Sequence, residues 1–190
     1  MQGEQPIDRQ FGDLSVTQLI VMAGLPGAGK STIGEIVGAR LGATVVSVDP
    51  IESSILRAGI DSDQPTGLAA YLVAEEIAEK ELLSGRTVIV DAVNAAESAR
   101  LQWRDLAART EVRLRVIEVV CSDEALHRAR LEKRERGLPH LEETTWRAVE
   151  QSLDGYAPWT GPSSALPRIT IDSVESLGSN VDAALSFIAA

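Results

Sequence analysis

One stretch of the chain combines glycines, a lysine and two hydroxyl residues at a spacing that suits phosphate chemistry. Residues 24–32 read GLPGAGKST, which fits G-x-x-x-x-G-K-[ST] at every fixed position. An apolar run at residues 19–23 precedes the stretch, and apolar residues at helical spacing follow it at residues 33–41. A strand, a glycine-rich turn and a helix in this order predict a loop that binds the phosphates of a nucleoside triphosphate.

The backbone of such a loop supplies most of the binding. Glycines permit a tight turn whose N–H groups point inward at phosphate oxygens, and the positive end of the following helix adds to that field. The predicted nucleotide-binding residues of the loop are Gly27, Ala28, Gly29, Lys30, Ser31 and Thr32. Lys30 is predicted to reach the β- and γ-phosphates, and the Ser31 hydroxyl to ligate Mg²⁺.

Two carboxylates follow the next two predicted strands. Asp91 follows four strand residues, where a second acidic residue holds Mg²⁺ directly or through water, so it is predicted as a metal ligand. Asp49 is predicted to orient or deprotonate an acceptor hydroxyl. The run Asp49-Pro50-Ile51-Glu52 is also a helix start with Asp as its N-cap, and one carboxylate can serve both purposes.

Asn94 allows two interpretations. It opens the capping pattern Asn94-Ala95-Ala96-Glu97, and it could equally hydrogen-bond a substrate or hold a water molecule. Arg57 and Arg100 are weaker candidates for contacts with the acceptor or with phosphate.

Basic residues gather between residues 128 and 136. They are Arg128, Arg130, Lys133, Arg134 and Arg136. Mixed with glutamates, such a run is by default a solvated helix face. The alternative is a mobile lid whose guanidinium groups close over the nucleotide, with the Gly137-Leu138-Pro139 break as its boundary. Arg130 and Arg134, four residues apart on one face, are the favoured lid residues, and Arg128 is the next candidate.

Other side chains carry less chemistry. His127 and His140 lack metal-ligand spacing with any cysteine, so neither is predicted as a ligand. The three tryptophans, at positions 103, 146 and 159, are interpreted as packing anchors rather than as a surface on which bases stack, with Trp159 in its Tyr-x-Pro-Trp setting as the one that could be an exception.

Strands and helices alternate along the chain. Strands are predicted at residues 19–23, 44–48, 87–90, 112–120 and 168–172, and helices at residues 50–58, 68–83, 95–109, 122–136, 142–153 and 181–188. In the helix over residues 68–83, the predicted buried stripe is Ala70, Val73, Ala74, Ile77, Ala78 and Leu82. This alternation predicts an α/β sandwich around a parallel sheet, which binds ligands at the carboxyl ends of its strands.

The bulk composition narrows the class of protein. A length of 190 residues predicts one domain, here residues 18–190, behind a loose polar lead-in at residues 1–17. The net charge of −10 argues against a protein that coats nucleic acid. A single cysteine, Cys121, together with the lack of an apolar run of membrane-spanning length and of signal-peptide features, favours the cytoplasm.

The chain resembles the small phosphate-loop kinases called AAA-domain 33, which include the kinase half of bacteriophage polynucleotide kinase, chloramphenicol phosphotransferase, gluconate kinase and the zeta toxins. The resemblance rests on residues 24–32, on the Val48-Asp49 strand end, on residues 88–94 (VIVDAVN) and on residues 130–134 (RLEKR). It implies a three-layer sandwich with a five-stranded parallel sheet in the order 2-3-1-4-5. It also implies a helical lid, at about residues 126–141.

The same resemblance implies that Mg²⁺-ATP is the donor and a hydroxyl group the acceptor. Asp49 matches the family's acceptor-activating aspartate, and Arg130 and Arg134 match its lid arginines. Many relatives carry arginine three residues after that aspartate, where this chain has Glu52. That difference favours a neutral or cationic small molecule over a nucleic acid, although Arg57 could substitute.

Together these features predict an ATP-dependent phosphotransferase that acts on a hydroxyl of a small molecule. The alternatives are a polynucleotide 5′-hydroxyl kinase, and an ATPase or switch module that works through a protein partner. The sequence leaves open the identity of the acceptor, the metabolic or toxin role and the oligomeric state.

Overall fold

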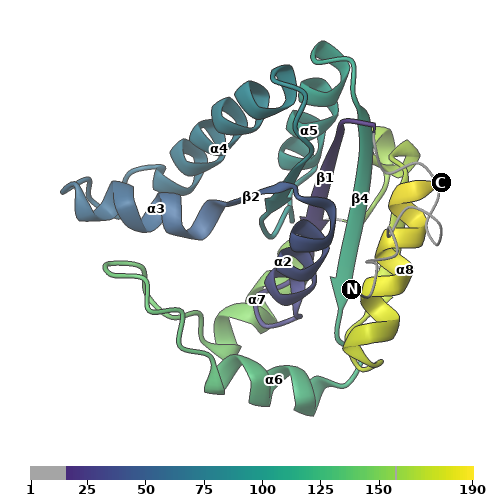
Figure 1. Cartoon of the computed structure of the whole chain (residues 1–190). Coiled ribbons are helices and arrows are strands. Elements are labelled where there is room, and N and C mark those ends of the chain that lie inside the picture. Colours follow the sequence, from purple (N-terminus) through teal and green to yellow (C-terminus); the bar gives the residue numbers. More distant parts are fainter. Residues whose placement is uncertain (1–15, 157) are drawn as a thin grey trace, which may run out of the picture.

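A parallel sheet forms the middle layer of the molecule (Figure 1). The computed structural model describes residues 16–156 and 158–190. The strands are β1 (Gln18–Ala23), β2 (Thr44–Ser47), β3 (Val88–Asp91), β4 (Arg113–Val120) and β5 (Arg168–Asp172). All the pairings are parallel and the order is β2-β3-β1-β4-β5. The predicted fold class and strand order are confirmed.

Helices cover both faces of the sheet. Helices α4 and α5 pack on one face, and α2 and α8 on the other. The helices of the described residues are α2 (Lys30–Leu41), α3 (Val48–Arg57), α4 (Thr66–Leu83), α5 (Glu97–Arg109), α6 (Glu124–Lys133), α7 (Trp146–Gly155), the 3-10 helix η1 (Gly161–Ala165) and α8 (Leu177–Ala189). Within the described residues, no helix has both the length and the apolar character that a membrane span requires.

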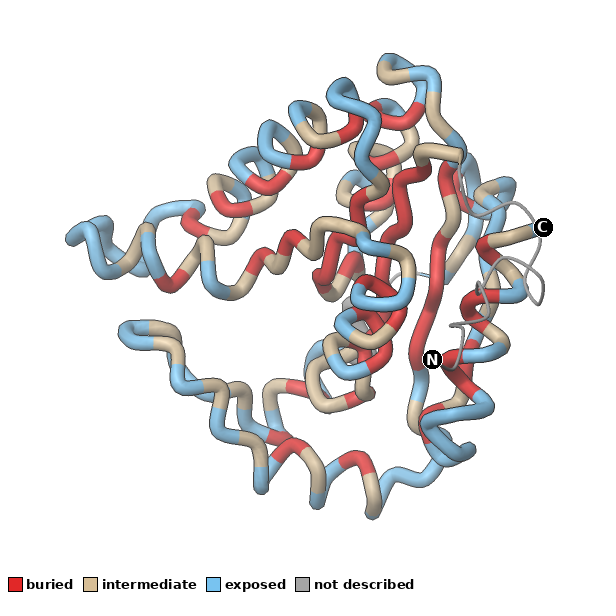
Figure 2. Tube along the Cα trace, in the orientation of Figure 1, coloured by how far each residue is buried: buried red, intermediate tan, exposed pale blue. Residues whose placement is uncertain are grey.

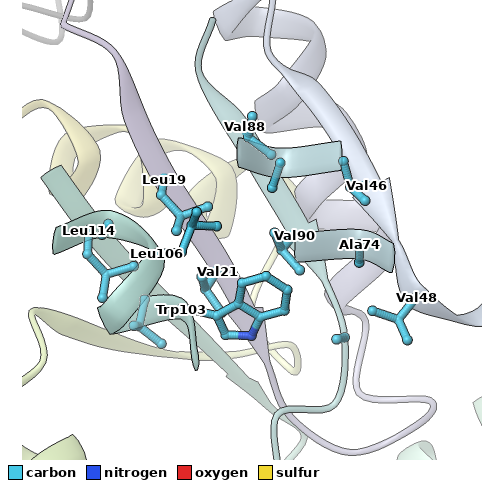
Figure 3. Close-up of a cluster of buried hydrophobic side chains, with 14 of the residues drawn as sticks. Leu19, Val21, Val46, Val48, Ala74, Val88, Val90, Trp103, Leu106 and Leu114 are labelled. Atoms are coloured by element: carbon cyan, nitrogen blue, oxygen red, sulfur yellow. The ribbon is translucent and has the colours of Figure 1, made fainter. Parts of the chain in front are cut away.

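Alternate residues of each central strand point to opposite faces and build two cores. On one face, Leu19 and Val21 of β1 pack with α4 and α5 around Trp103, which is 1% exposed (Figure 3). On the other face, Ile20 and Met22 pack with α2 and α8. The central strands are therefore buried from both sides (Figure 2), as expected for a parallel sheet between two helical layers.

The buried stripe of α4 is narrower than predicted. Ala70, Ala74, Ala78 and Leu82 are buried, but Val73 is 43% exposed and Ile77 is 40% exposed. Alanines at every fourth position let α4 lie close to the sheet, so the neighbouring positions 73 and 77 turn outward. The prediction that these two residues belong to the core was wrong.

Some element boundaries also differ from the predictions. Val48, predicted as the end of a strand, begins α3, and the predicted helix at residues 142–153 begins at Trp146. Residues 134–145 are irregular, and in Figure 1 this segment extends from α6 to lie beneath α3. The Ser53 hydroxyl of α3 donates a hydrogen bond to the carbonyl of Pro139 at 2.5 Å, so the two segments touch.

Gly24 is the glycine of the phosphate-loop motif with the least room for a side chain. Its φ is 131°, and a Cβ built on it would lie 2.1 Å from the carbonyl oxygen of Val119. We expect Gly24→Ala to lower the free energy of unfolding by about 2–4 kcal/mol through backbone strain and a forced shift of β4. Chemical denaturation measures this loss. Gly178→Ala is the control, since that helical glycine has open space around it. Equal stability of both variants would contradict the expectation.

Candidate nucleotide and acceptor site

The predicted phosphate loop joins β1 to α2 at the carboxyl edge of the sheet. Gly27 and Gly29 have φ values of 82° and 102°, which favour glycine, and Lys30 opens the helix. The backbone N–H of Gly24 donates to the carbonyl of Val93, which ties the loop to the segment after β3 (3.1 Å). The predicted order of strand, turn and helix is confirmed.

Two cavities meet at this loop. The first, of about 420 Å³, is lined by Gly27, Gly29, Lys30, Ser31, Thr32, Ile33, Arg130, Arg134, Ser173, Glu175, Leu177 and Asn180. The second, of about 430 Å³, lies on the side of α3, β3 and the 134–145 segment. Lys30, Ser31 and Arg134 line both cavities. These three residues therefore mark the boundary across which a group could pass from one cavity to the other.

Lys30 is 7% exposed and sits at this boundary. Its Nζ donates to the carbonyl oxygen of Leu25 at 3.0 Å. Burial lowers the pKa of Lys30 to about 8, and the opposing attraction of Asp91 and Asp49 only partly offsets that effect. A buried ammonium group with little competing solvation is well suited to bind phosphate oxygens.

This pKa makes nucleotide binding dependent on pH. Only the charged form of Lys30 attracts phosphates, and bound phosphates raise its pKa, so affinity is full below about pH 8 and falls above it. We expect the dissociation constant for ATP to rise by up to about tenfold per pH unit above that value. Isothermal calorimetry between about pH 7 and 9.5 tests this. Lys30→Met is the control, and a wild-type affinity that follows the same pH curve as this variant would contradict the assignment.

Asp91 ends β3 beside the loop and is 9% exposed. Its Oδ1 is buried and makes no hydrogen bond within the described part of the chain. Asp91 and Ser31 both line the second cavity. A buried carboxylate oxygen without a hydrogen bond and a hydroxyl group that lines the same cavity fit the oxygen donors that Mg²⁺ prefers.

Asp49 lies in the first turn of α3, but it does not cap the helix. The N-cap position belongs to Ser47, and no side chain accepts a hydrogen bond there. The capping interpretation of Asp49 was therefore wrong. Instead, Asp49 Oδ2 accepts a hydrogen bond from Nη1 of Arg136 (3.1 Å) and lies 3.9 Å from Nη2 of Arg134. Asp49 lines the second cavity together with Lys30 and Asp91.

The basic cluster divides between the two cavities and the outer surface. Arg130 lines the first cavity and binds Ser173 through its hydroxyl (2.8 Å) and its carbonyl (3.0 Å). Arg134 lines both cavities. Arg128 instead pairs with Glu132 one turn along α6, exposed and away from both cavities. The prediction that Arg128 binds nucleotide does not fit this position.

Asn94 is a structural residue. It is fully buried, its amide donates to the carbonyl of Met22 (2.7 Å), and its oxygen accepts from Nε1 of Trp103 (2.8 Å). The helix that follows begins at Glu97 with Ala96 as its N-cap. Neither the capping interpretation nor the substrate-binding interpretation of Asn94 fits, because the side chain joins β1 to α5 inside the core.

The two weaker arginine candidates are also placed away from the cavities. Arg100 is 2% exposed, donates to the carbonyl of Asn94 (2.9 Å) and stacks on the ring of Trp159, 3.9 Å from its centroid. Arg57 is exposed at the end of α3 and lines neither cavity. The predicted contacts of Arg57 and Arg100 with acceptor or phosphate are therefore not supported.

Helix α6 is attached directly to the phosphate loop. A ring nitrogen of His127, Nε2, lies 2.8 Å from the carbonyl oxygen of Pro26, and the imidazole packs edge-on against Trp146. Leu131 packs with Trp146 and Leu25 in a small cluster of its own. Trp103 and Trp146 pack against other side chains, as predicted, and Trp159, the possible exception, packs against the core as well. The helix that carries Arg128 and Arg130 is therefore held against the phosphate loop by these contacts.

Sequence reasoning missed some of the residues at this site. Arg136 was noted only as a member of the basic cluster, yet its side chain is 7% exposed and it is the closest cation to Asp49. Ser173 and Glu175 of the β5–α8 connection and Leu177 and Asn180 at the start of α8 line the first cavity, far along the chain from the loop. Their position just after the last parallel strand was the available signal, because ligands bind at that edge of the sheet.

Comparison with known proteins places the chain in a family. The family model described as AAA domain, AAA-domain 33, matches residues 19–159. No curated protein sequence matches the chain to a significant degree.

Solved structures agree on the fold. A sugar kinase from Janibacter sp. shares 17% identity with a TM-score of 0.68, covering 90% of this chain and 94% of its own. A gluconokinase from Sinorhizobium meliloti shares 18% identity with a TM-score of 0.62, covering 93% of each chain. Kti12 from Chaetomium thermophilum, in complex with ADP-AlF3, shares 20% identity with a TM-score of 0.67, covering 90% of this chain and all of its own. At these identities the likeness establishes the fold.

Proposed function

The chain belongs to the AAA-domain family whose model spans residues 19–159, and on that premise we propose that it is an ATP-dependent phosphotransferase that acts on a hydroxyl of a small molecule. The observation that carries the proposal is the meeting of two cavities at Lys30, Ser31 and Arg134, with a carboxylate, Asp49, facing the boundary from the second cavity. A donor in one cavity and an acceptor in the other would bring the reacting atoms together there.

The first cavity is the proposed donor side. The backbone N–H groups of the loop, residues 27–32, and Lys30 would hold the phosphates of ATP, and Arg130 of α6 and Arg134 just after that helix would approach them. The base would lie toward Ser173 and Glu175 of the β5–α8 connection and Leu177 at the start of α8. The ADP-AlF3 complex of Kti12, a neighbour in fold, supports nucleotide as the ligand of this fold.

The second cavity is the proposed acceptor side. Asp49 would accept the proton of the attacking hydroxyl or orient that hydroxyl toward the γ-phosphate. Ser31 and Asp91 would hold Mg²⁺, which neutralises charge on the phosphates when bound. In the balanced reaction the acceptor oxygen bonds to phosphorus, the bond to the β,γ-bridging oxygen breaks, and the proton leaves the acceptor. Because the transition state is loose, position and charge neutralisation supply most of the catalysis.

Residues 18–190 would act as one kinase domain in the cytoplasm, with a lid formed by about residues 126–141. The names of the fold neighbours, a sugar kinase and a gluconokinase, support a small hydroxyl compound as acceptor. The net charge of −10 weighs against nucleic acid in that role.

An assay of ADP formation tests the proposal. Purified protein with Mg²⁺-ATP is incubated with sugars, polyols, nucleosides, antibiotics and a 5′-hydroxyl oligonucleotide, and the phosphorylated product is identified by mass spectrometry. We expect one small molecule to raise ADP formation well above the basal rate. A response to the oligonucleotide alone would support a polynucleotide kinase instead. Hydrolysis that no acceptor stimulates would support a switch or ATPase that works through a partner.

A further inference from the structure

Charge in the second cavity, the proposed acceptor side, is unevenly distributed. Among the described residues that line it, the carboxylates are Glu35, Asp49, Glu52, Asp91 and Glu142, and the cations are Lys30, Arg134 and Arg136. The carboxylates outnumber the cations, and an anionic compound entering the cavity would meet their field at close range.

The cations of this cavity are engaged with groups of the protein or face the donor side. Lys30 and Arg134 also line the first cavity. The guanidinium of Arg136 donates to Asp49 Oδ2 (3.1 Å), to Glu143 Oε2 (3.1 Å) and to the carbonyl of Glu142. Its backbone N–H donates to Glu143 Oε1 at 2.9 Å, so Glu143 binds both the backbone and the side chain of Arg136. With Asp49 and Glu143 beside it, the charge of Arg136 is offset before any ligand arrives.

Some of the carboxylates remain open toward the cavity. Glu35 on α2 and Glu142 in the 134–145 segment are both exposed. Glu52 accepts a hydrogen bond from the Thr66 hydroxyl at 2.8 Å. Because this donor is neutral, the carboxylate of Glu52 keeps its negative charge. An acceptor with hydroxyl or ammonium groups therefore finds partners in this cavity, whereas a carboxylate or phosphate group finds repulsion.

We propose that the second cavity selects an uncharged or positively charged hydroxyl compound and rejects anionic ones, with the Arg136–Glu143 pair and Glu142 as the residues that set this preference. The proposal rests on the assignment of this cavity as the acceptor side. It concerns the charge class of the substrate, so its failure and that of the phosphotransferase assignment give different results.

The test uses compounds of one carbon skeleton and different charge: glucose, glucosamine, gluconate and glucose 6-phosphate. Binding of each to the ADP-loaded full chain is measured by calorimetry, which needs no turnover, and ADP formation from ATP is measured in parallel. We expect the two anionic compounds to bind at least about tenfold more weakly than glucose or glucosamine. An anionic member that binds as tightly as glucose, or a panel in which no member binds, would overturn the inference.

Charge-neutralising variants identify the residues responsible. Glu142→Gln leaves the backbone carbonyl that Arg136 uses, and Glu143→Gln frees part of the Arg136 guanidinium. We expect each variant to raise the affinity for gluconate and glucose 6-phosphate, relative to the affinity for glucose, by about three- to tenfold. The matched control is Glu132→Gln, which removes an equivalent charge from the Arg128 pair on the outer face of α6. An equal effect of the control, or no effect of either cavity variant, would overturn the assignment to these residues.

The combined readouts separate the two proposals. Binding in the expected order without turnover would refute the phosphotransferase and leave the charge preference standing. Turnover of an anionic acceptor at the rate of its neutral counterpart would refute the charge preference and leave the phosphotransferase proposal standing.

Discussion

Replacing Lys30 with alanine is expected to reduce ATP turnover by about 10²–10³-fold, the effect of removing one donor to a developing negative charge in a water-poor site. Lys30 is 7% exposed and lies at the boundary of the two cavities, so its charge is only weakly screened by solvent. Nucleotide affinity should fall too, because the ammonium also binds the ground-state phosphates. Acceptor-stimulated ADP formation and calorimetry with ATP measure the two effects.

Lys80→Ala is the control for this experiment, since Lys80 is an exposed lysine on α4. It should leave both turnover and ATP affinity within about twofold of the parent, as expected for surface substitutions. Thermal unfolding shows whether the Lys30 variant is folded. A folded Lys30→Ala protein with parental turnover would exclude the proposed donor site.

Asp49→Asn is expected to lower kcat by about 10²–10⁴-fold, the usual contribution of a positioned general base. The amide has nearly the same shape as the carboxylate but cannot take the proton of an attacking hydroxyl. Because Asp49 lines the second cavity and not the first, ATP affinity should stay within about threefold of the parent. A loss in kcat without a loss in ATP binding would separate acceptor activation from nucleotide binding.

The control for Asp49 is Asp105→Asn, which changes the same group in an exposed ion pair with Arg104 on α5. Two results would contradict the assigned role. The first is an Asp49→Asn enzyme with parental kcat, and the second is a loss of activity that follows a loss of ATP binding. Arg136 and Arg134 both lie near Asp49, so circular dichroism should accompany the kinetics to detect any loosening of this region.

The sequence by itself determined the architecture and the phosphate loop of the site. Apolar runs of strand length alternate with segments of helical period, and this alternation permits only a helix-covered parallel sheet. The phosphate loop is one continuous segment, so its glycines, Lys30 and Ser31 are positioned by local geometry alone. Asp49 and Asp91 were found for a related reason: each follows a predicted strand, and the carboxyl ends of parallel strands share one edge.

Only the tertiary structure decided which polar residues face that edge and which support it. Asn94 and Arg100 come soon after β3 in the chain, where residues of the site are expected. The packing of α5 nevertheless encloses both side chains in the core. Spacing along one segment does not reveal this, because burial depends on what another segment brings against it.

The same physical reason explains the basic cluster. Arg128 and Arg136 are alike in sequence, but Arg128 faces outward while residue 136 meets a carboxylate 87 positions away. Arg130 finds Ser173, 43 positions away, in the β5–α8 connection. The role of a charged side chain is set by its partners, and these partners come together only when segments distant in the chain fold against each other.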